Sequence, residues 1–374
     1  MIYFDSAATT FQKPRSVAAA MEDALATMSS PGRGGYGAAM RAADAAFACR
    51  EALAELYHLK NPEQVVFTMN ATHALNIAIK SLVPKGGRAV ISGYEHNAVT
   101  RPLAALGAET AVAAGPLFHP EAVEAAFDRE ITPGTDAVIC NHVSNVFGFV
   151  QPVEAVAAIC RSRGVPFIID ASQSAGVLPL DMEALGAAFI AMPGHKGLYG
   201  PQGTGVLLCG QGVETATLLE GGTGSMSLQQ AMPDFLPDRL EAGTHNMPGI
   251  AGLLAGVQFV RSQGLGAICR RERLLALLAA DGLKKLPGVR VYAQPDLADQ
   301  AGVVSFTAEG REVEALAGAL AERGIAVRAG LHCAPAAHQT AGTVDTGTVR
   351  ASFSHWNTPE EVARFLAAMG EILR

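Results

Sequence analysis

The stretch AFIAMPGHKGLYGPQGTGVLLCG, residues 188–210, is the most informative part of this chain. It places Lys196 in a glycine-rich turn between two apolar runs, at 189–191 and 206–209. Lysines are usually solvated surface residues, so a lysine between buried runs is unusual. Burial lowers the pKa of a lysine and makes its amine nucleophilic toward an aldehyde. The stretch does not follow the GxxxxGK[ST] order of a phosphate-binding loop, which disfavours a nucleoside triphosphatase.

Short apolar runs alternate with helical stretches on both sides of this segment. Helices are predicted over 15–27 and 38–57, and strands at 65–68, 89–92, 137–140, 167–169, 189–191 and 206–209. This alternation predicts an α/β layer with a mostly parallel, buried sheet. In such sheets, functional residues gather just past the carboxyl ends of the strands.

The pattern changes near residue 249. A helical region reaches about residue 286, and strands at VRVYAQ, VVSFTAEG, IAVRA and TVRASFS alternate with helices at 312–323 and from 359 onward. The first dozen residues are too short to fold alone and are expected to pack on this part. We therefore predict a large domain over 15–248 and a small domain made of 1–14 and 249–374.

Composition and charge narrow the class of protein. The chain has 374 residues, of which 49% are hydrophobic and 17% charged, and its formal net charge is −7. This length suits a two-domain metabolic enzyme. The sequence contains no run of Lys and Arg that would indicate a nucleic-acid partner. The start lacks the features of a secretory signal, and the longest apolar stretch, 249–260, is too short to span a bilayer. We expect a cytoplasmic protein without membrane contact.

The six cysteines form no CxxC pair, and their spacing fits neither a zinc site nor a disulfide framework, so no metal site is expected. Cys140, Cys160 and Cys209 sit in apolar runs, where buried thiols act as small hydrophobes. Cys333 differs, because it lies in RAGLHCAPAAH, among Gly, Pro and His, and this composition predicts a loop.

Polar residues follow several predicted strands. Asp170 ends PFIID, where it could cap a helix or pair with a cationic ring nitrogen. The segment NATHALN opens a helix whose free N–H groups and dipole favour an anion, although simple capping explains it equally well. His96 and Asn145 follow two further strands. A pyridoxal ring needs a lysine, a carboxylate, a phosphate cradle and a stacking partner, and these strand ends supply all four.

Read together, these motifs resemble the class V aminotransferase superfamily of pyridoxal-phosphate (PLP) enzymes, fold type I. Within it the chain is most similar to the cysteine desulfurases, group II, the Suf-type desulfurases and selenocysteine lyases. The motifs that carry the resemblance, in order, are YFDSAATTFQKP, NATHALN, EHNA, HVSNVFG, DASQ, GHK, EAGTHN, RAGLHC and VRASFSHWNT. The resemblance implies a large domain with a mostly parallel seven-stranded sheet between helices, and a smaller C-terminal α/β domain.

The resemblance also implies roles in cofactor binding. Lys196 would carry PLP as a Schiff base and move the substrate's Cα proton, Asp170 would pair with the ring nitrogen, and His96 would stack on the ring. The remaining cofactor contacts would come from Gln173 and Asn145 near the ring's phenolic oxygen, from Ala71, Thr72 and His195 near the phosphate, and from Thr244 of the other subunit of a homodimer. Arg33 is a further candidate for a contact across the subunit boundary.

For the substrate, the resemblance implies that Arg350 clamps the carboxylate of L-cysteine or selenocysteine, with Arg328, Asn145 and Ala8 nearby. The Cys333 thiolate, stabilised by Arg328 and His332, would attack the substrate's sulfur. This would yield alanine and an enzyme persulfide, whose sulfur then passes to an acceptor protein, as in iron–sulfur cluster assembly.

The chain departs from the family pattern at Gly197, which is an extra residue, at Pro193 in place of a serine, at Ala71 in place of a threonine and at Leu331 in place of a histidine. These departures leave three alternatives to a cysteine desulfurase open. One is a selenocysteine lyase or cysteine sulfinate desulfinase, another is a class V aminotransferase or epimerase, and the third is a non-enzymatic protein of the same fold. The presence of Cys333 disfavours the second, and the Lys196, Asp170 and Arg350 set disfavours the third.

Overall fold

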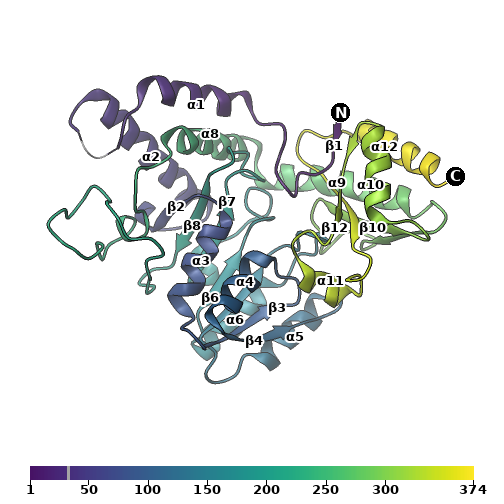
Figure 1. Cartoon of the computed structure of the whole chain (residues 1–374), viewed down its shortest axis with the longest axis horizontal. Helices are drawn as coiled ribbons and strands as arrows, with labels where there is room; N and C mark the ends of the chain where they lie inside the picture. Colours follow the sequence, from purple (N-terminus) through teal and green to yellow (C-terminus); the bar gives the residue numbers. More distant parts are fainter. Residues whose placement is uncertain (32–33) are drawn as a thin grey trace.

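A seven-stranded sheet forms the centre of the computed structural model, which describes residues 1–31 and 34–374 (Figure 1). The strand order is β2-β8-β7-β6-β5-β3-β4, and only β8 runs antiparallel to its neighbours. The strands are β2 (Val65–Thr68), β3 (Arg88–Ser92), β4 (Glu109–Ala113), β5 (Ala137–Asn141), β6 (Phe167–Asp170), β7 (Phe189–Pro193) and β8 (Gly205–Cys209). The predicted mostly parallel, seven-stranded sheet is therefore confirmed.

Helices cover both faces of this sheet. They are α1 (Arg15–Thr27), α2 (Gly37–Leu56), α3 (Ala71–Leu82), α4 (Asn97–Leu106), α5 (Pro120–Glu130), α6 (Val153–Arg163), the short α7 (Met182–Leu185) and α8 (Met247–Gln263), with 3-10 turns at Pro62–Gln64 and Asp238–Leu240. Successive strand residues point to opposite faces, so Val138 and Cys140 enter one apolar core while Ala137 and Ile139 enter the other. Burial on both faces explains why the central strands read as unbroken apolar runs.

A second, antiparallel sheet lies toward the C-terminus, with strand order β12-β13-β10-β9. Its strands are β9 (Val289–Tyr292), β10 (Val303–Ala308), β12 (Arg328–Gly330) and β13 (Thr348–Ser352), and the helices around it are α9 (Leu265–Leu283), α10 (Val313–Glu322), α11 (Pro335–Ala341) and α12 (Pro359–Ile372). The N-terminal strand β1 (Ile2–Tyr3) pairs with β11 (Ile325–Ala326), so the first residues do pack on this part of the chain. α11 stands within the segment that was predicted to be a loop.

The boundary between the two domains stays a prediction at residues 248–249. Helix α8 begins there, yet its buried side chains, including Ile250, Leu253 and Val257, join the core of the large sheet. α8 also packs against α1 and α2. This packing favours a boundary at Gly264, which ends α8 and precedes α9.

None of the helices in the described part of the chain is both long and apolar enough to cross a bilayer.

Candidate active site

A cavity of about 210 Å³ opens at the carboxyl ends of the parallel strands. It brings together all the predicted site residues except Thr244 and Cys333. The predicted residues that line it are Ala8, Ala71, Thr72, His96, Asn145, Asp170, Gln173, His195, Lys196, Arg328 and Arg350. Residues more than 300 positions apart in the sequence thus share one cavity, because β12 and β13 face the ends of the large sheet.

Lys196 follows β7 in a turn that the N-terminal segment holds in place. The carbonyl of His195 accepts a hydrogen bond from Lys13 Nζ at 2.8 Å, and the His195 ring lies 3.0 Å from Thr9 Oγ1. Burial lowers the pKa of Lys196 to about 8, with Arg350 and Arg328 acting in the same direction and Asp170 against it. About a tenth of the amine is therefore neutral and available as a nucleophile at pH 7, far more than for a lysine in water.

The glycine after Lys196, Gly197, has a packing reason. A Cβ on Gly197 would lie 2.4 Å from the carbonyl oxygen of Ala175. On the facing chain, Gly176 has φ +81°, and a Cβ there would lie 2.1 Å from the carbonyl oxygen of Gly197. Two backbones thus touch directly behind the lysine, which only a pair of glycines permits.

Asp170 ends β6 and is only 4% exposed. Its Oδ1 accepts a hydrogen bond from the N–H of Ser172 at 2.8 Å. Gln173 follows on the same turn and donates from Nε2 to the carbonyl of Ala7 at 2.9 Å. The carboxylate is therefore fixed at the floor of the cavity, where a cationic ring nitrogen can approach it.

The N-terminus of α3 offers a place for an anion. Asn70 caps the helix, and its Oδ1 accepts the N–H of His73 at 2.9 Å. The N–H groups of Ala71 and Thr72 have no acceptor within residues 1–31 and 34–374. Free first-turn N–H groups bind phosphates in many proteins, so this end of the cavity fits a phosphate.

His96 caps α4 beside the cavity. Its Nδ1 accepts the N–H of Ala98 at 3.0 Å, which requires a neutral ring with the proton on Nε2. Burial lowers the pKa of His96, and this agrees with the neutral form. The ring is therefore held without charge, as a stacking partner needs.

Arg350 on β13 is 1% exposed and takes part in a polar network with Asp5 and Asn145. Its Nη2 lies 2.6 Å from Asp5 Oδ1, and its Nη1 donates to the carbonyl of Asn145 at 2.8 Å. Arg350 Nε and Asn145 Oδ1 have no partner in the described part of the chain. A buried donor and a buried acceptor are thus left over, as expected of a site that binds a polar ligand.

Asp5 was missed from the sequence, and so was Glu95. Glu95 is fully buried, and burial raises its pKa to about 8. Its Oε1 accepts hydrogen bonds from Ser92 Oγ at 2.5 Å and from the N–H of Asn141 at 2.7 Å, which ties the end of β3 to β5. Both acids stand inside motifs that were quoted, YFDSAATT and EHNA, but nothing local indicates what they contact.

Cys333 lies outside the cavity, in an adjoining groove that shares Thr72, His96 and Ala98 with it. The thiol is exposed. Cys333 and His332 both adopt left-handed backbone conformations, with φ +58° and +48°, which costs roughly 1–3 kcal/mol for each residue.

Two hydrogen bonds hold this strained loop. Asn145 Nδ2 donates to the carbonyl of His332, and the N–H of Asn97 donates to the carbonyl of Cys333, both at 2.8 Å. The second bond attaches the loop to the N-terminus of α4, the positive end of the helix dipole. Strain of this kind, held by surrounding contacts, is typical of functional sites.

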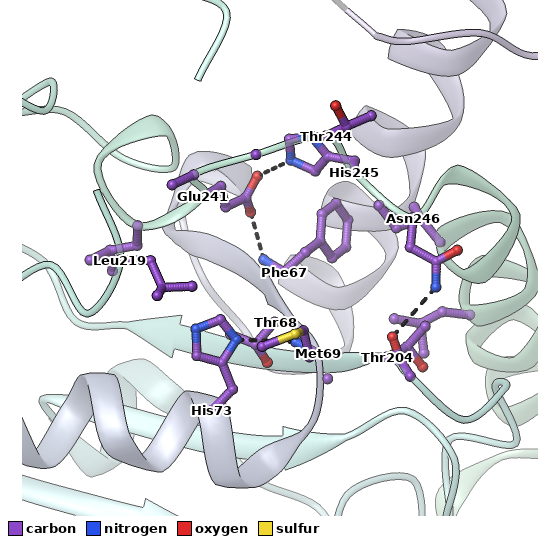
Figure 2. A pocket seen from close by; sticks show the side chains of 17 residues that line it. Phe67, Thr68, Met69, His73, Thr204, Leu219, Glu241, Thr244, His245 and Asn246 are labelled. Atoms are coloured by element: carbon purple, nitrogen blue, oxygen red, sulfur yellow. Dashed lines mark hydrogen bonds and ion pairs between the residues drawn. The ribbon is translucent and has the colours of Figure 1, made fainter. Parts of the chain in front are cut away.

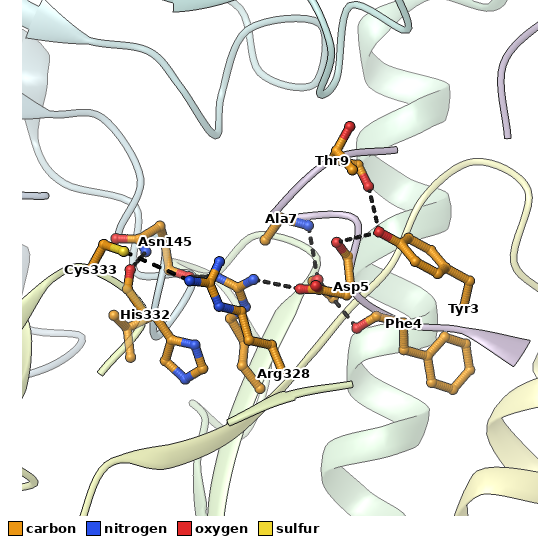
Figure 3. Close-up of polar contacts among 12 residues, drawn as sticks. Tyr3, Phe4, Asp5, Ala7, Thr9, Asn145, Arg328, His332 and Cys333 are labelled. Atoms are coloured by element: carbon orange, nitrogen blue, oxygen red, sulfur yellow. Dashed lines mark hydrogen bonds and ion pairs between the residues drawn. The ribbon is translucent and has the colours of Figure 1, made fainter. Parts of the chain in front are cut away.

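The charge next to the thiol comes from Arg328, whose Nη2 lies 3.7 Å from Cys333 Sγ (Figure 3). The expectation that His332 adds to it is wrong. The His332 ring is buried, with Nε2 3.1 Å from the carbonyl of Thr348, and burial lowers its pKa to about 2. His332 is therefore uncharged, and its contact with the Thr348 carbonyl helps to hold the loop in place.

Thr244 is exposed and lines a different cavity, of about 160 Å³ (Figure 2). The loop that carries it is fixed by Glu241, which accepts hydrogen bonds from Arg50 Nη1 at 2.9 Å, Arg50 Nη2 at 2.7 Å and the N–H of Phe67 at 2.6 Å. Thr244 therefore does not reach the Lys196 cavity of its own chain. The other proposed boundary residue, Arg33, lies outside the described residues.

No group of three or more His, Cys, Asp and Glu side chains could hold a metal ion within residues 1–31 and 34–374.

Comparisons with known proteins agree on one family. A family profile described as "Aminotransferase class-V" matches residues 2–365. A "Probable cysteine desulfurase" of Mycolicibacterium paratuberculosis is 34% identical, over 100% of this chain and 55% of that protein. A "Probable cysteine desulfurase" of Methanothermobacter thermautotrophicus is 33% identical, over 99% of this chain and 94% of that protein.

Among solved structures, the apo structure of a cysteine desulfurase from Thermococcus onnurineus NA1 is similar to the whole chain. Its TM-score is 0.89 at 32% sequence identity, and the match covers 100% of this chain and 94% of that one. The chain thus spans little more than half of the Mycolicibacterium protein, but nearly all of the other two.

Proposed function

Since this chain belongs to the class-V aminotransferase family, and to the cysteine desulfurases within it, we propose that it converts L-cysteine to L-alanine with PLP as cofactor. The sulfur passes to Cys333 as a persulfide and then to an acceptor. The observation that carries this proposal is the position of Cys333. An exposed thiol stands on a strained loop directly beside the cavity that contains Lys196, Asp170 and Arg350.

The residues of the cavity fit PLP. The free N–H groups of Ala71 and Thr72 suit its phosphate, Asp170 suits its ring nitrogen, and the neutral His96 ring suits stacking. Lys196 supplies the amine that binds its aldehyde. When bound, PLP withdraws electrons from the substrate's Cα, which eases loss of the Cα proton and makes the substrate's sulfur electrophilic.

The chain's own residues perform the other tasks. Arg350 binds the substrate's carboxylate through a guanidinium that Asp5 and Asn145 already hold in position. Lys196, whose pKa of about 8 lies near the working pH, takes up and returns the Cα proton.

Cys333 then acts as the nucleophile. Its thiolate attacks the substrate's sulfur, so that a new S–S bond forms while the Cβ–S bond breaks. The electron pair of the broken bond stays on Cβ, which gains a proton and becomes the methyl group of alanine. Arg328, 3.7 Å away, stabilises the thiolate.

We also propose a homodimer. Large apolar side chains are exposed along α2 and in the long segment between β8 and α8, and Figure 1 places this segment on the same side of the molecule as α2. They are Tyr36, Met40, Phe47, Leu219, Met226, Leu228 and Phe235. Clustered exposed apolar side chains often mark interfaces, and Thr244 lines the same cavity as Leu219, one of this set.

The test compares wild type with Cys333→Ser on L-cysteine in the presence of a reductant, with alanine and sulfide both measured. Cys269→Ser, which changes another thiol that is not fully buried, is the matched control. We expect wild type and the control to release alanine and sulfide in equal amounts, and Cys333→Ser to fall close to background. Full activity of Cys333→Ser would refute the role of Cys333 and favour a selenocysteine lyase or desulfinase. Products other than alanine would refute the desulfurase reaction.

A further inference from the structure

The groove on the outer side of Cys333 has a volume of about 320 Å³. Its lining residues are Thr72, Asn76, His96, Asn97, Ala98, Arg101, Pro102, Ala105 and Cys333. Because Thr72, His96 and Ala98 also line the Lys196 cavity, the thiol stands between two spaces. The inner one serves the amino-acid substrate, and the outer one is open to a second molecule.

This groove is positively charged, although the chain as a whole carries a formal net charge of −7. Arg101 is exposed and takes part in no ion pair or side-chain hydrogen bond within residues 1–31 and 34–374. No acidic residue is among those that line the groove. His96 adds no charge, because burial lowers its pKa. Arg328, on the inner side of the thiol, adds a second positive charge.

Arg101 lies on α4 close to the point where the cysteine loop is attached, and both Arg101 and Cys333 line the groove. Asn97 and Arg101 are four residues apart, so they share one face of the helix. Asn97 is also the residue whose N–H binds the carbonyl of Cys333, at 2.8 Å. Arg101 therefore stands one helical turn from the point where the cysteine loop is attached.

The size and lining of the groove favour a small molecule over a protein. Its volume lies at the lower end of the roughly 300–1,000 Å³ that small-molecule sites occupy. Its lining contains none of the aromatic anchors that dominate protein interfaces. What it offers is one thiol, one unpaired cation, two side-chain amides and one hydroxyl group.

We propose that this groove binds the sulfur acceptor, and that the acceptor is a small thiol bearing an anionic group that Arg101 holds. The inference rests on the proposed function, since it needs a Cys333 persulfide. In the transfer, the acceptor's thiolate attacks the outer sulfur of the persulfide. The enzyme's S–S bond breaks, its electron pair returns to Cys333 as a thiolate, and the acceptor leaves as a persulfide.

The test follows single-turnover transfer from holoenzyme that has been loaded with L-cysteine and then freed of excess substrate. The acceptors are 3-mercaptopropionate, which is anionic, and 2-mercaptoethanol, which is neutral. Wild type, Arg101→Gln and Arg101→Lys are compared with each thiol separately, so that the thiols' intrinsic reactivities cancel. Arg374→Gln removes the same charge at the far end of the chain and is the matched control.

We expect Arg101→Gln to slow transfer to 3-mercaptopropionate about fivefold, the upper range for one exposed ion pair, and to leave transfer to 2-mercaptoethanol unchanged. Arg101→Lys should retain most of the wild-type rate, and Arg374→Gln all of it. Equal effects of Arg101→Gln on both thiols, or none on the anionic one, would overturn the inference while the persulfide itself still supports the proposed function. Wild type that forms no persulfide would overturn both.

Discussion

The properties of Lys196 come from its surroundings and not from its own chemistry. A lysine in water is charged well above neutral pH, but here burial outweighs the attraction of Asp170 and lowers the pKa from 10.5 to about 8. Arg328 and Arg350 add to the effect, because two fixed positive charges nearby make a third one costly. Arg350 and Arg328, which are proposed to bind the substrate's carboxylate and stabilise the thiolate, therefore also lower the pKa of Lys196.

This pKa sets the pH dependence of cofactor uptake. Only the neutral amine attacks an aldehyde, so the rate at which cofactor-free protein binds PLP covalently should rise about tenfold per pH unit below pH 8 and level off above it. The growth of the visible absorbance of the lysine-bound cofactor measures this rate. A rate that keeps rising toward pH 10 would show that Lys196 has an ordinary lysine pKa.

Asp170 permits a second prediction. Asp170→Asn keeps the shape of the side chain but removes the charge that would hold the ring nitrogen protonated. Alanine formation should fall by about 100-fold or more, the usual cost of losing one preorganised electrostatic contact in an active site. The control is Asp281→Asn, which removes the same charge from an exposed position on α9. A loss of less than about threefold would remove Asp170 from its assigned role, since that is below about 1 kcal/mol.

Individual site residues could be predicted from the sequence where one rule was enough, namely that functional residues gather at strand ends. Asp170 ends a strand, and Lys196, His96 and Asn145 each follow one, at the edge where ligands bind in parallel sheets. Asp5 could not be assigned, because its partner Arg350 is 345 residues away along the chain. The burial of His332, which removes its charge, depends on β13 and cannot be read from RAGLHC.

Among the structural elements, the turn after β7 contributes most directly to the site, because it contains Lys196. It is placed by contact between two backbones, at Gly176 and Gly197, and by the N-terminal segment that binds the His195 carbonyl. Gly197 is therefore fitted to this turn by close packing against Ala175 and Gly176.

Gly197→Ala should destabilise the protein by roughly 1–3 kcal/mol, the cost of overpacking, because the added Cβ meets the Ala175 carbonyl. Urea unfolding measures this change. Gly318→Ala is the control, since Gly318 lies within α10 with nothing within 4 Å of an added Cβ. That substitution should stabilise the protein slightly, by up to about 1 kcal/mol. If the two variants changed stability alike, the contact behind Lys196 would not constrain the turn.

The predicted elements match the structure best where both sides of a strand are buried. β2 runs from Val65 to Thr68 as predicted, and the other predicted strands of the large sheet extend by only one or two residues. β4 was not predicted, because this edge strand, ETAVA, is largely exposed and carries polar residues. α11 was read as a loop, because its Ala-rich turn follows directly on Gly, His and Pro.

In the whole molecule, the active site depends on segments far apart in the chain. Lys196 and Asp170 come from the large sheet, Arg328 and Arg350 from the small one, and Asp5 from the N-terminal segment. Thr244 lies in another cavity of the same chain, so a contact with the cofactor requires a second subunit. The proposed dimer would therefore complete each site with a residue from its partner.

Mixed dimers test this arrangement. Lys196→Ala and Thr244→Ala homodimers should each be impaired, but in a mixed dimer both defects fall on one site and the other site is intact. Mixing the two proteins under conditions of subunit exchange should therefore restore activity, toward that of one normal site in each mixed dimer. Absence of any restoration, although mixed dimers are detected by mass, would mean that Thr244 serves its own subunit or none.

In the proposed reaction, Cys333 receives the sulfur of L-cysteine. The most direct measurement is mass spectrometry of holoenzyme that has been mixed with isotopically sulfur-labelled L-cysteine, trapped by alkylation and digested. We predict one labelled sulfur on the peptide that contains Cys333, formed as fast as alanine appears, and none on the peptides of the other five cysteines. Alanine formation without label on Cys333, or label on another cysteine that appears first, would show that Cys333 is not the sulfur-receiving residue.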